Sequence, residues 1–187
     1  METTFHDMTF EAKPGLVFTP RPATEQLVDV ALERIGTRPA RVADVGTGSG
    51  VIAITLARLA PQIEVWASDV CANALTLAQH NADLLGTVVH FTKGDLLEGM
   101  PRDLDLIVAN LPYLAPNTAG YDGEPARAVF STGDGFDHYR RLLAAAADHL
   151  TADGGVIIQV PGEVLEAERS ELPWLRGRLD ALVARAA

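Results

Sequence analysis

Short apolar runs alternate along the chain with longer segments in which apolar residues recur three and four positions apart. The first pattern predicts strands and the second predicts amphipathic helices. The expected strands are residues 41–46, 63–68, 87–92, 104–109 and 155–160. The expected helices are residues 23–35, 51–60, 71–85 and 136–150. This alternation indicates an α/β fold of Rossmann-like architecture, with a mostly parallel sheet and helices on both faces.

Length and composition are those of an ordinary globular domain. The chain has 187 residues, of which 48% are hydrophobic and 21% are charged. Its apolar runs are far shorter than the roughly 20 residues that a membrane helix requires. The N-terminus has no basic region followed by an apolar stretch, so we expect a cytoplasmic protein with no membrane contact. The net charge of −10 argues against strong nonspecific binding to nucleic acid.

Cysteine and histidine give no sign of a disulfide or a metal centre. Cys71 is the single cysteine, and the five histidines are scattered along the sequence. Neither spacing matches a ligand pattern, so we expect no metal.

The first candidate site is the segment Asp-Val-Gly-Thr-Gly-Ser-Gly, which joins the first expected strand to the second expected helix. Its glycines are Gly46, Gly48 and Gly50, a spacing that differs from the dinucleotide fingerprint Gly-x-Gly-x-x-Gly. Glycines at such a turn let a ligand approach the backbone, and Asp44 can accept from an ammonium group directly or through water. The pattern suits a nucleoside with a cationic amino-acid tail better than a pyrophosphate. The alternative is a tight structural connection without a ligand.

Two further acids follow the next two expected strands. Asp69 lies about 20 residues after the glycines, where a carboxylate can accept hydrogen bonds from both ribose hydroxyls. The alternative role for Asp69 is to cap the helix that starts near Cys71. After the third strand, Asp95 can accept from an adenine amino group while Leu96 packs on the ring, although Gly-Asp-Leu is also a common turn.

The second candidate site is the tetrapeptide Asn110, Leu111, Pro112 and Tyr113, which directly follows the expected strand 104–109. The oxygen of Asn110 can accept one N–H of a flat, uncharged nitrogen group, and the carbonyl of Leu111 can accept another. Pro112 confines residue 111 to extended conformations, and Tyr113 offers an aromatic face for stacking. An isolated match of this kind is more often a simple turn, so its significance depends on the glycines upstream.

A long segment rich in glycine and proline connects Tyr113 to Gly135. Loops of this length in a compact domain are usually functional. We therefore expect it to form one wall of the substrate site.

In this order, the motifs resemble those of class I S-adenosylmethionine-dependent methyltransferases. Three segments narrow the resemblance to the HemK/PrmC family: Thr-Pro-Arg-Pro-Ala-Thr-Glu at residues 19–25, the tetrapeptide at residues 110–113, and residues 124–139. Members of that family methylate the side-chain amide of the glutamine in the Gly-Gly-Gln motif of peptide chain release factors. The similarity covers about residues 10–160, and the motifs are specific for this family when they occur together in this order.

The resemblance implies bound S-adenosylmethionine, a protein substrate such as a release factor, and a set of site residues. The implied cofactor-binding residues are Asp44, Gly46, Thr47, Gly48, Gly50, Asp69, Asp95, Leu96 and Asn110. The implied catalytic residues are Asn110, Leu111, Pro112 and Tyr113. The implied substrate-binding residues are Pro20, Arg21, Pro22, Thr24 and Glu124.

Position 111 departs from the family, whose tetrapeptide usually reads Asn-Pro-Pro-Tyr. Asn-Leu-Pro-Tyr is also similar to the ribosomal RNA adenine dimethyltransferases, so an exocyclic base amine of RNA or DNA is the alternative acceptor. The acidic composition weighs against nucleic acid. A noncatalytic scaffold with this fold is a third interpretation, which the intact set of Asp44, Asp69 and Asn110 disfavours.

We expect residues 1–187 to form a single methyltransferase domain. Within it, residues 1–22 are expected to be an N-terminal lid or substrate segment, residues 23–160 the cofactor-binding core, and residues 161–187 a shortened C-terminal segment.

That C-terminal segment looks too short for the antiparallel strand pair that normally completes the sheet in this family, and from Pro173 it has helical spacing. We therefore expect five parallel strands in the order 3-2-1-4-5, with residues 155–160 at an edge. An uncovered edge strand attracts another chain. We expect an apolar helical stripe to cover it in a monomer, with a weak dimer as the alternative. The stripe consists of Leu175, Leu179, Leu182 and Val183.

Overall fold

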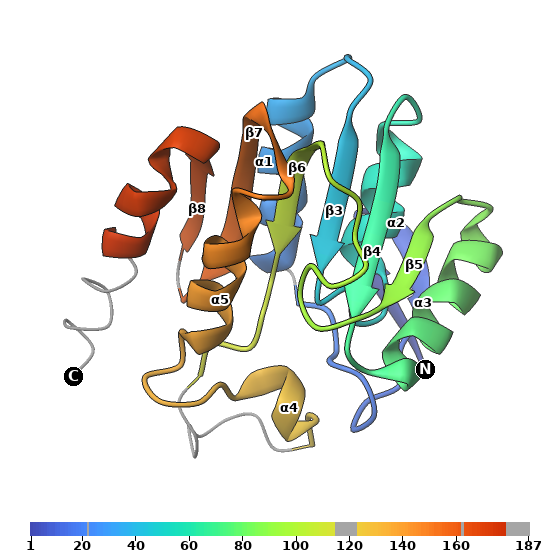
Figure 1. Cartoon of the computed structure of the whole chain (residues 1–187). Helices are drawn as coiled ribbons and strands as arrows, with labels where there is room; N and C mark the ends of the chain where they lie inside the picture. The colour runs from blue at the N-terminus through green and yellow to red at the C-terminus, as the bar shows by residue number, and fades with distance from the viewer. Residues whose placement is uncertain (22, 115–122, 162, 179–187) are drawn as a thin grey trace.

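A central sheet of six strands organises the molecule (Figure 1). The computed structural model describes residues 1–21, 23–114, 123–161 and 163–178. In sheet order, the strands are β5 (His90–Lys93), β4 (Glu64–Asp69), β3 (Arg41–Val45), β6 (Leu104–Ala109), β7 (Leu150–Val160) and β8 (Glu163–Glu168). The first five run parallel, and β8 runs antiparallel to β7.

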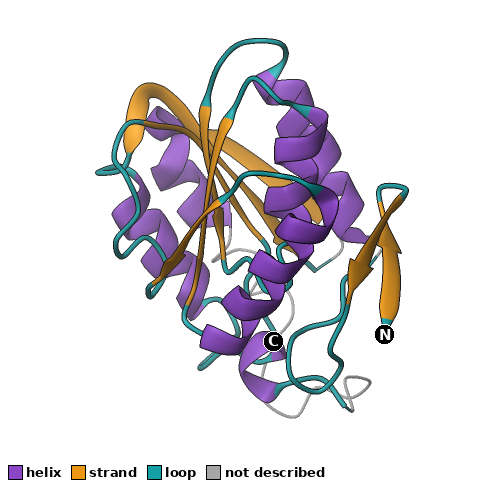
Figure 2. Ribbon diagram, turned by 90° about the vertical axis from the view of Figure 1, so that its right-hand side faces the viewer, coloured by secondary structure: helices purple, strands orange, loops and turns teal. Residues whose placement is uncertain are grey.

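Helices flank the sheet on both sides (Figure 2). They are α1 (Ala23–Ile35), α2 (Val51–Leu59), α3 (Ala72–Leu85), α4 (Ala126–Val129), α5 (Asp137–Ala146) and the short 3-10 helix η1 (Arg169–Glu171), after which residues 172–178 are also helical. Side chains of α1, α2 and α3 contribute to the apolar core on one face, and those of α5 and residues 172–178 to the core on the other. In the described part of the chain, no helix has the length and apolar character needed to cross a membrane.

The fold class predicted from the strand and helix pattern is confirmed, and the five parallel strands have the predicted order. Strands buried on both faces read as nearly continuous apolar runs, as in β6, whose last four residues are buried. Three predicted ranges differ from the structure by three residues or more at one end, and one of them is the strand expected at 155–160, which is β7 and begins at Leu150. The strand expected at 87–92 is β5, which begins at His90, and the helix expected at 136–150 ends at Ala146. That helix is shorter because Leu150 already begins the 11-residue strand β7.

The prediction that the sheet ends at strand 155–160 is wrong. β8 covers that strand through six residue pairs in an antiparallel register. Leu165 and Ala167 of β8 are buried in the core, whereas Glu166 and Glu168 are exposed. This period of two is a strand signal, and the helical interpretation of the C-terminal segment overlooked it.

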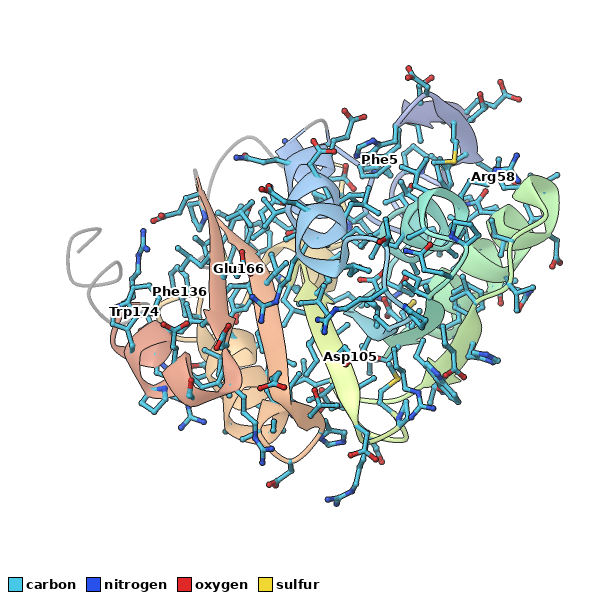
Figure 3. All side chains as sticks on the ribbon, turned by 90° about the horizontal axis from the view of Figure 1, so that it is seen from above. Phe5, Arg58, Asp105, Phe136, Glu166 and Trp174 are labelled. Carbon is cyan, nitrogen blue, oxygen red and sulfur yellow. The ribbon has the colours of Figure 1, made fainter. Side chains whose placement is uncertain are left out.

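Contacts on both faces hold β8 in place. Glu166 projects toward α1, where Nη1 of Arg34 donates a hydrogen bond to its Oε1 at 2.5 Å (Figure 3). Residues 172–178 are helical as predicted, and Leu172 and Leu175 are buried in the opposite core. The remaining residues of the predicted stripe lie outside the described residues: Leu179, Leu182 and Val183.

A β-hairpin that the sequence patterns did not predict precedes α1. Strands β1 (Glu2–Phe5) and β2 (Met8–Glu11) pair across a two-residue turn in which His6 and Asp7 both have positive φ. Hairpin turns of this shape usually contain glycine or asparagine, so the sequence carried little signal. Phe5, labelled in Figure 3, is buried in the same core as α1 and α2.

The fully buried side chain of Asn81 on α3 fastens this hairpin to the core. Its Oδ1 accepts from the N–H of Glu11 at 2.8 Å, and its Nδ2 donates to the carbonyls of Glu11 and Ser49 at 3.1 and 2.9 Å. Because Ser49 belongs to the glycine-rich turn, one amide connects the hairpin, α3 and that turn.

The register of the sheet brings the two candidate motifs together. Val45 at the end of β3 lies opposite Ala109 at the end of β6. The glycine-rich turn and the tetrapeptide therefore emerge side by side at the carboxyl edge of the sheet, where α/β folds bind ligands. α4 lies below this edge in Figure 1.

Candidate functional site

The glycine-rich segment makes a tight turn between β3 and α2. Gly46 has φ +76° and Gly50 has φ +86°, a region that favours glycine. A Cβ at Gly46 would lie 2.7 Å from Cδ2 of Leu111, and one at Gly50 would lie 2.8 Å from Cδ1 of Ile54. Both positions therefore favour glycine for their backbone shape, and at Gly50 a Cβ would also lie 3.2 Å from the backbone Cα of Ala78.

Asp44 is completely buried beneath this turn. Its Oδ2 accepts hydrogen bonds from the Thr47 hydroxyl at 2.7 Å and the Ala53 N–H at 3.2 Å, whereas Oδ1 has no partner among the described residues. Burial raises the pKa of Asp44 from 3.8 to about 7, and the two hydrogen bonds offset only part of this effect. Its contact with an ammonium group stays a prediction.

Asp69, at the end of β4, ties the turn to the next helix. Its Oδ2 accepts from the N–H of Gly48 at 2.9 Å, and its Oδ1 accepts from the N–H of Cys71 at 2.8 Å, at the start of α3. Cys71 is itself the N-cap residue of α3, so this bond holds the backbone that precedes the helix and is not a side-chain capping bond. Each oxygen keeps a further lone pair, so the ribose contact remains chemically open and stays a prediction.

Asp95 and Leu96 follow β5. The carboxylate of Asp95 forms an ion pair with Arg141 of α5. Leu96 has φ +54°, and its carbonyl accepts from the Ser68 hydroxyl at 2.6 Å. These contacts fix the loop beside β4, and the expected adenine contacts stay predictions.

A cavity of about 210 Å³ opens along this edge of the sheet. One set of lining residues, here named the turn side, follows β3, β4 and β5: Gly46, Thr47, Gly48, Asp69, Asp95 and Leu96. A second set, here named the tetrapeptide side, surrounds the ends of β6 and β7: Thr24, Asn110, Leu111, Pro112, Tyr113 and Gln159. Pro20 and Arg21 also line the cavity. Most residues predicted for the site are thus brought to one place.

Three residues predicted for the site do not line the cavity: Asp44, Gly50 and Glu124. Gly50 supports the shape of the turn, and Asp44 lies buried beneath it with one carboxylate oxygen unpartnered among the described residues. The carboxylate of Glu124 accepts from the N–H of Thr19 at 3.2 Å and so ties the N-terminal segment to the start of α4. Pro22 lies outside the described residues.

The amide of Asn110 is oriented by a hydrogen bond from its Nδ2 to the Thr24 hydroxyl at 3.1 Å. Thr24 is buried at the start of α1. The bond commits the amide nitrogen to the protein and leaves the Asn110 oxygen to accept from a ligand. Thr24 is therefore a positioning residue for Asn110.

The tetrapeptide backbone is held from beneath by the fully buried Tyr139 of α5. The Tyr139 hydroxyl accepts from the N–H of Leu111 at 3.0 Å, and it lies within hydrogen-bonding distance of the carbonyls of Leu111 and Gln159. Burial raises the pKa of Tyr139 well above its usual value, so the hydroxyl stays protonated. The Leu111 carbonyl keeps a second lone pair for a ligand.

The long connection after the tetrapeptide contributes to the cavity as predicted. Leu114 and three residues of α4 line it, and residues 115–122 lie outside the described residues. The α4 residues are Arg127, Ala128 and Val129. Nη2 of Arg127 donates to Sγ of Cys71 at 2.9 Å, which connects this wall to α3. Within the described ranges, no group of three or more His, Cys, Asp or Glu side chains is arranged to hold a metal ion.

The sequence patterns did not identify Tyr139 and Gln159 as residues of the candidate site. Tyr139 was expected only as one apolar position of its helix, and Gln159 stood inside an otherwise apolar strand. A polar side chain within a run destined for burial on both faces was the available signal.

Comparisons with known proteins agree with this geometry. A release factor glutamine methyltransferase of Deinococcus radiodurans is 42% identical over 164 residues, which cover 83% of this chain and 59% of that protein. The protein of the same name from Lactococcus lactis subsp. lactis is 36% identical over 150 residues, which cover 77% of this chain and 56% of that protein. The chain thus spans somewhat more than half the length of these curated relatives.

Among solved structures, the ribosomal protein L11 methylase of Lactobacillus delbrueckii subsp. bulgaricus superposes with a TM-score of 0.57 at 31% identity, covering 74% of this chain and 60% of that one. The family model described as the methyltransferase small domain matches residues 8–123. The methyltransferase resemblance inferred from the sequence motifs is therefore confirmed, and the chain belongs to the methyltransferase small domain family.

Proposed function

We propose that this chain is an S-adenosylmethionine-dependent N-methyltransferase acting on the side-chain amide of a glutamine in a protein such as a peptide chain release factor. One observation carries the proposal: Asn110 and the glycine-rich turn line the same cavity, and the amide nitrogen of Asn110 is already committed to Thr24. The names of the relatives that are 42% and 36% identical support the same reaction.

Residues at the turn fit this cofactor. Asp69 presents a half-buried carboxylate whose remaining lone pairs suit the two ribose hydroxyls. The unpartnered Oδ1 of Asp44 suits the positive charge of an amino-acid tail, directly or through water. Asp95 and Leu96 suit the amino group and the ring of adenine. When bound, the cofactor supplies a methyl group that its sulfonium makes electrophilic.

The residues of the tetrapeptide side compensate for the low nucleophilicity of the acceptor nitrogen. A carboxamide nitrogen is a poor nucleophile because its lone pair is delocalised into the carbonyl. The oxygen of Asn110 accepts one N–H of the carboxamide, the Leu111 carbonyl accepts the other, and Tyr113 stacks against the flat group. These contacts orient the nitrogen and stabilise the positive charge that it develops. The proton leaves after methyl transfer, so no strong general base is needed.

Positioning supplies most of the rate enhancement in this scheme. Reactants held in a productive orientation gain roughly 7–11 kcal/mol relative to a bimolecular encounter. Asn110 is held by Thr24, and Leu111 is held by Tyr139, so both acceptor oxygens are oriented before substrate arrives. A base amine of RNA or DNA has the same hydrogen-bond needs, but the net charge of −10 weighs against nucleic acid.

Methyl incorporation from labelled S-adenosylmethionine tests the proposal. The acceptors are a release factor, the same factor with the glutamine of its Gly-Gly-Gln motif replaced by alanine, ribosomal RNA and DNA. We expect label in the unchanged factor alone. Label in RNA or DNA, or equal label in the alanine-substituted factor, would refute the proposed acceptor.

The proposal places the protein in the cytoplasm, where release factors act, as a monomer or weak dimer. The sheet ends at β8, and the exposed Glu166 and Glu168 place charged side chains on this edge strand, which disfavours pairing with another chain and supports the monomer. Light scattering over a range of protein concentrations measures this directly, and a stable dimer at low concentration would contradict it.

A further inference from the structure

Gln159 is a buried polar side chain with an unused hydrogen-bonding atom. The residue is 7% exposed, and its Oε1 has no hydrogen-bond partner among the described residues. It lines the cavity, together with Thr24 and Asn110. A buried carbonyl oxygen without a partner destabilises the folded protein, so its retention at a cavity wall indicates a ligand that completes it.

The strand geometry fixes where this side chain points. Ile158 and Val160 belong to the core beside α5, whereas Ile157 belongs to the core beside α1. Since side chains alternate along a strand, Gln159 faces the α1 side, where Thr24 begins the helix. Its backbone carbonyl accepts from Tyr139 on the opposite side, which anchors the strand at this residue.

The register places Gln159 next to Asn110. Ala109 of β6 lies opposite Ile158 of β7 in a parallel pair, so the residues that follow them stand side by side at the carboxyl edge. Both side chains end in a carboxamide, and both line the cavity. Asn110 donates through its nitrogen to Thr24, which leaves its oxygen to accept from a ligand, and Oε1 of Gln159 has no partner among the described residues.

We propose that Gln159 is a second recognition residue for the methyl acceptor, with its Oε1 accepting a hydrogen bond from an N–H of that substrate beside the group held by Asn110. This inference rests on the proposed methyl transfer but not on which N–H-bearing acceptor is used. Gln159 then raises specificity for acceptors that carry a second N–H at this point. An acceptor lacking that N–H leaves the buried oxygen unpaired and binds less well.

The pair Gln159→Met and Thr55→Val tests the proposal. Methionine keeps the length of the side chain and removes its amide. Thr55 is the matched control, because its buried Oγ1 also lacks a described partner but Thr55 does not line the cavity. Removal of an unpartnered buried polar group does not destabilise a protein, so we expect both variants to unfold at or above the midpoint of the unchanged chain.

The two variants should differ in kcat/KM for the methyl acceptor. We expect Gln159→Met to lower kcat/KM for the acceptor by about tenfold to a hundredfold, mainly through KM, and to leave the affinity for S-adenosylhomocysteine unchanged. Thr55→Val should leave both quantities unchanged. The assay uses the acceptor that the unchanged chain methylates among release factor, RNA and DNA.

Three outcomes for the Gln159→Met variant overturn the inference. A lower unfolding midpoint for Gln159→Met would make the residue structural, and a loss of S-adenosylhomocysteine affinity would assign it to the cofactor. Unchanged acceptor kinetics would remove it from recognition. Transfer to RNA or DNA instead of the release factor would refute the proposed glutamine acceptor while the comparison of variants still decides the role of Gln159. No transfer to any of the three would overturn both.

Discussion

The turn side and the tetrapeptide side of the cavity are built in different ways. On the turn side, the carboxylates of Asp69 and Asp44 accept hydrogen bonds mainly from backbone N–H groups of the turn and of the segments that follow β3 and β4. On the tetrapeptide side, Asn110 and Leu111 are held by Thr24 and Tyr139, which lie 86 and 28 positions away in sequence. The first is held largely through backbone N–H groups, and the second through side chains of α1 and α5.

This difference indicates which side of the site determines specificity for the methyl acceptor and which side does not. Under the proposed function, the turn side binds the methyl donor and so serves any acceptor that uses this donor. The tetrapeptide side combines β6, β7, α1 and α5 around open acceptor oxygens, so its specificity depends on several elements at once. Substitutions on the two sides should therefore separate cofactor affinity from turnover.

The largest expected effect is on the turn side. Asp69→Ala should weaken S-adenosylmethionine binding by roughly 3 kcal/mol or more, because two hydrogen bonds to a charged group are lost at about 1.5–3 kcal/mol each. Calorimetry measures this change. Asp153→Ala, which removes an exposed carboxylate of β7, is the control and should leave affinity unchanged. Normal affinity in Asp69→Ala would remove Asp69 from the site.

On the tetrapeptide side, Asn110→Ala should lower turnover by at least about 100-fold while cofactor affinity stays nearly intact, as when a transition-state contact is lost. Steady-state methyl transfer and calorimetry on the same samples give both quantities. Asn73→Ala, an exposed position on α3, is the matched control. Near-normal turnover in Asn110→Ala would refute the proposed contact of Asn110 with the acceptor. An equal loss of cofactor affinity would show that the two sides do not separate turnover from cofactor binding.

Tyr139→Phe should destabilise the fold by about 2 kcal/mol, because it leaves the buried N–H of Leu111 without its partner. Urea unfolding gives the free energy of unfolding for both proteins. Turnover should fall along with it, since the Leu111 carbonyl loses its support. A variant as stable as the unchanged protein would show that Tyr139 does not hold the tetrapeptide.

The smallest expected effect is a pH dependence of cofactor binding. Burial raises the pKa of Asp44 to about 7 in the free protein, so below that pH the carboxyl is neutral and does not attract an ammonium group. Binding of a cationic tail favours the ionised form, so affinity should rise as pH rises toward 7 and then level off. The rise between pH 6 and 7.5 should be roughly tenfold. Asp44→Asn should abolish it, and a flat profile for the unchanged protein would refute this contact.

Sequence reasoning was strongest where local patterns determine structure. The alternation of parallel strands with helices and the bounds of α1 followed from apolar runs and helical spacing, whereas the order of the strands followed from the family resemblance. The residues of the turn side followed from glycine spacing and from acids at strand ends. In each case the signal and the structure occupy the same short segment.

Most of the failures have a different physical origin. β8 is the exception, because it pairs with its neighbour β7 and carried a local signal, the period of two, which the helical interpretation overlooked. The N-terminal hairpin has no glycine or asparagine at its turn and is fastened by Asn81, which lies 70 positions from Glu11. Tyr139 and Gln159 are polar groups inside apolar patterns, and their roles depend on which carbonyl or cavity lies opposite them. Such tertiary partners are not encoded in local spacing.

A crystal structure of the chain with S-adenosylhomocysteine and a Gly-Gly-Gln peptide tests the two-sided site most directly. We predict the ribose on Asp69 and the glutamine carboxamide nitrogen about 2.7–3.2 Å from the oxygen of Asn110, with the Thr24 bond unchanged. A carboxamide bound away from Asn110, or a ribose that does not contact Asp69, would contradict the assignment of cofactor and acceptor to the two sides of this cavity.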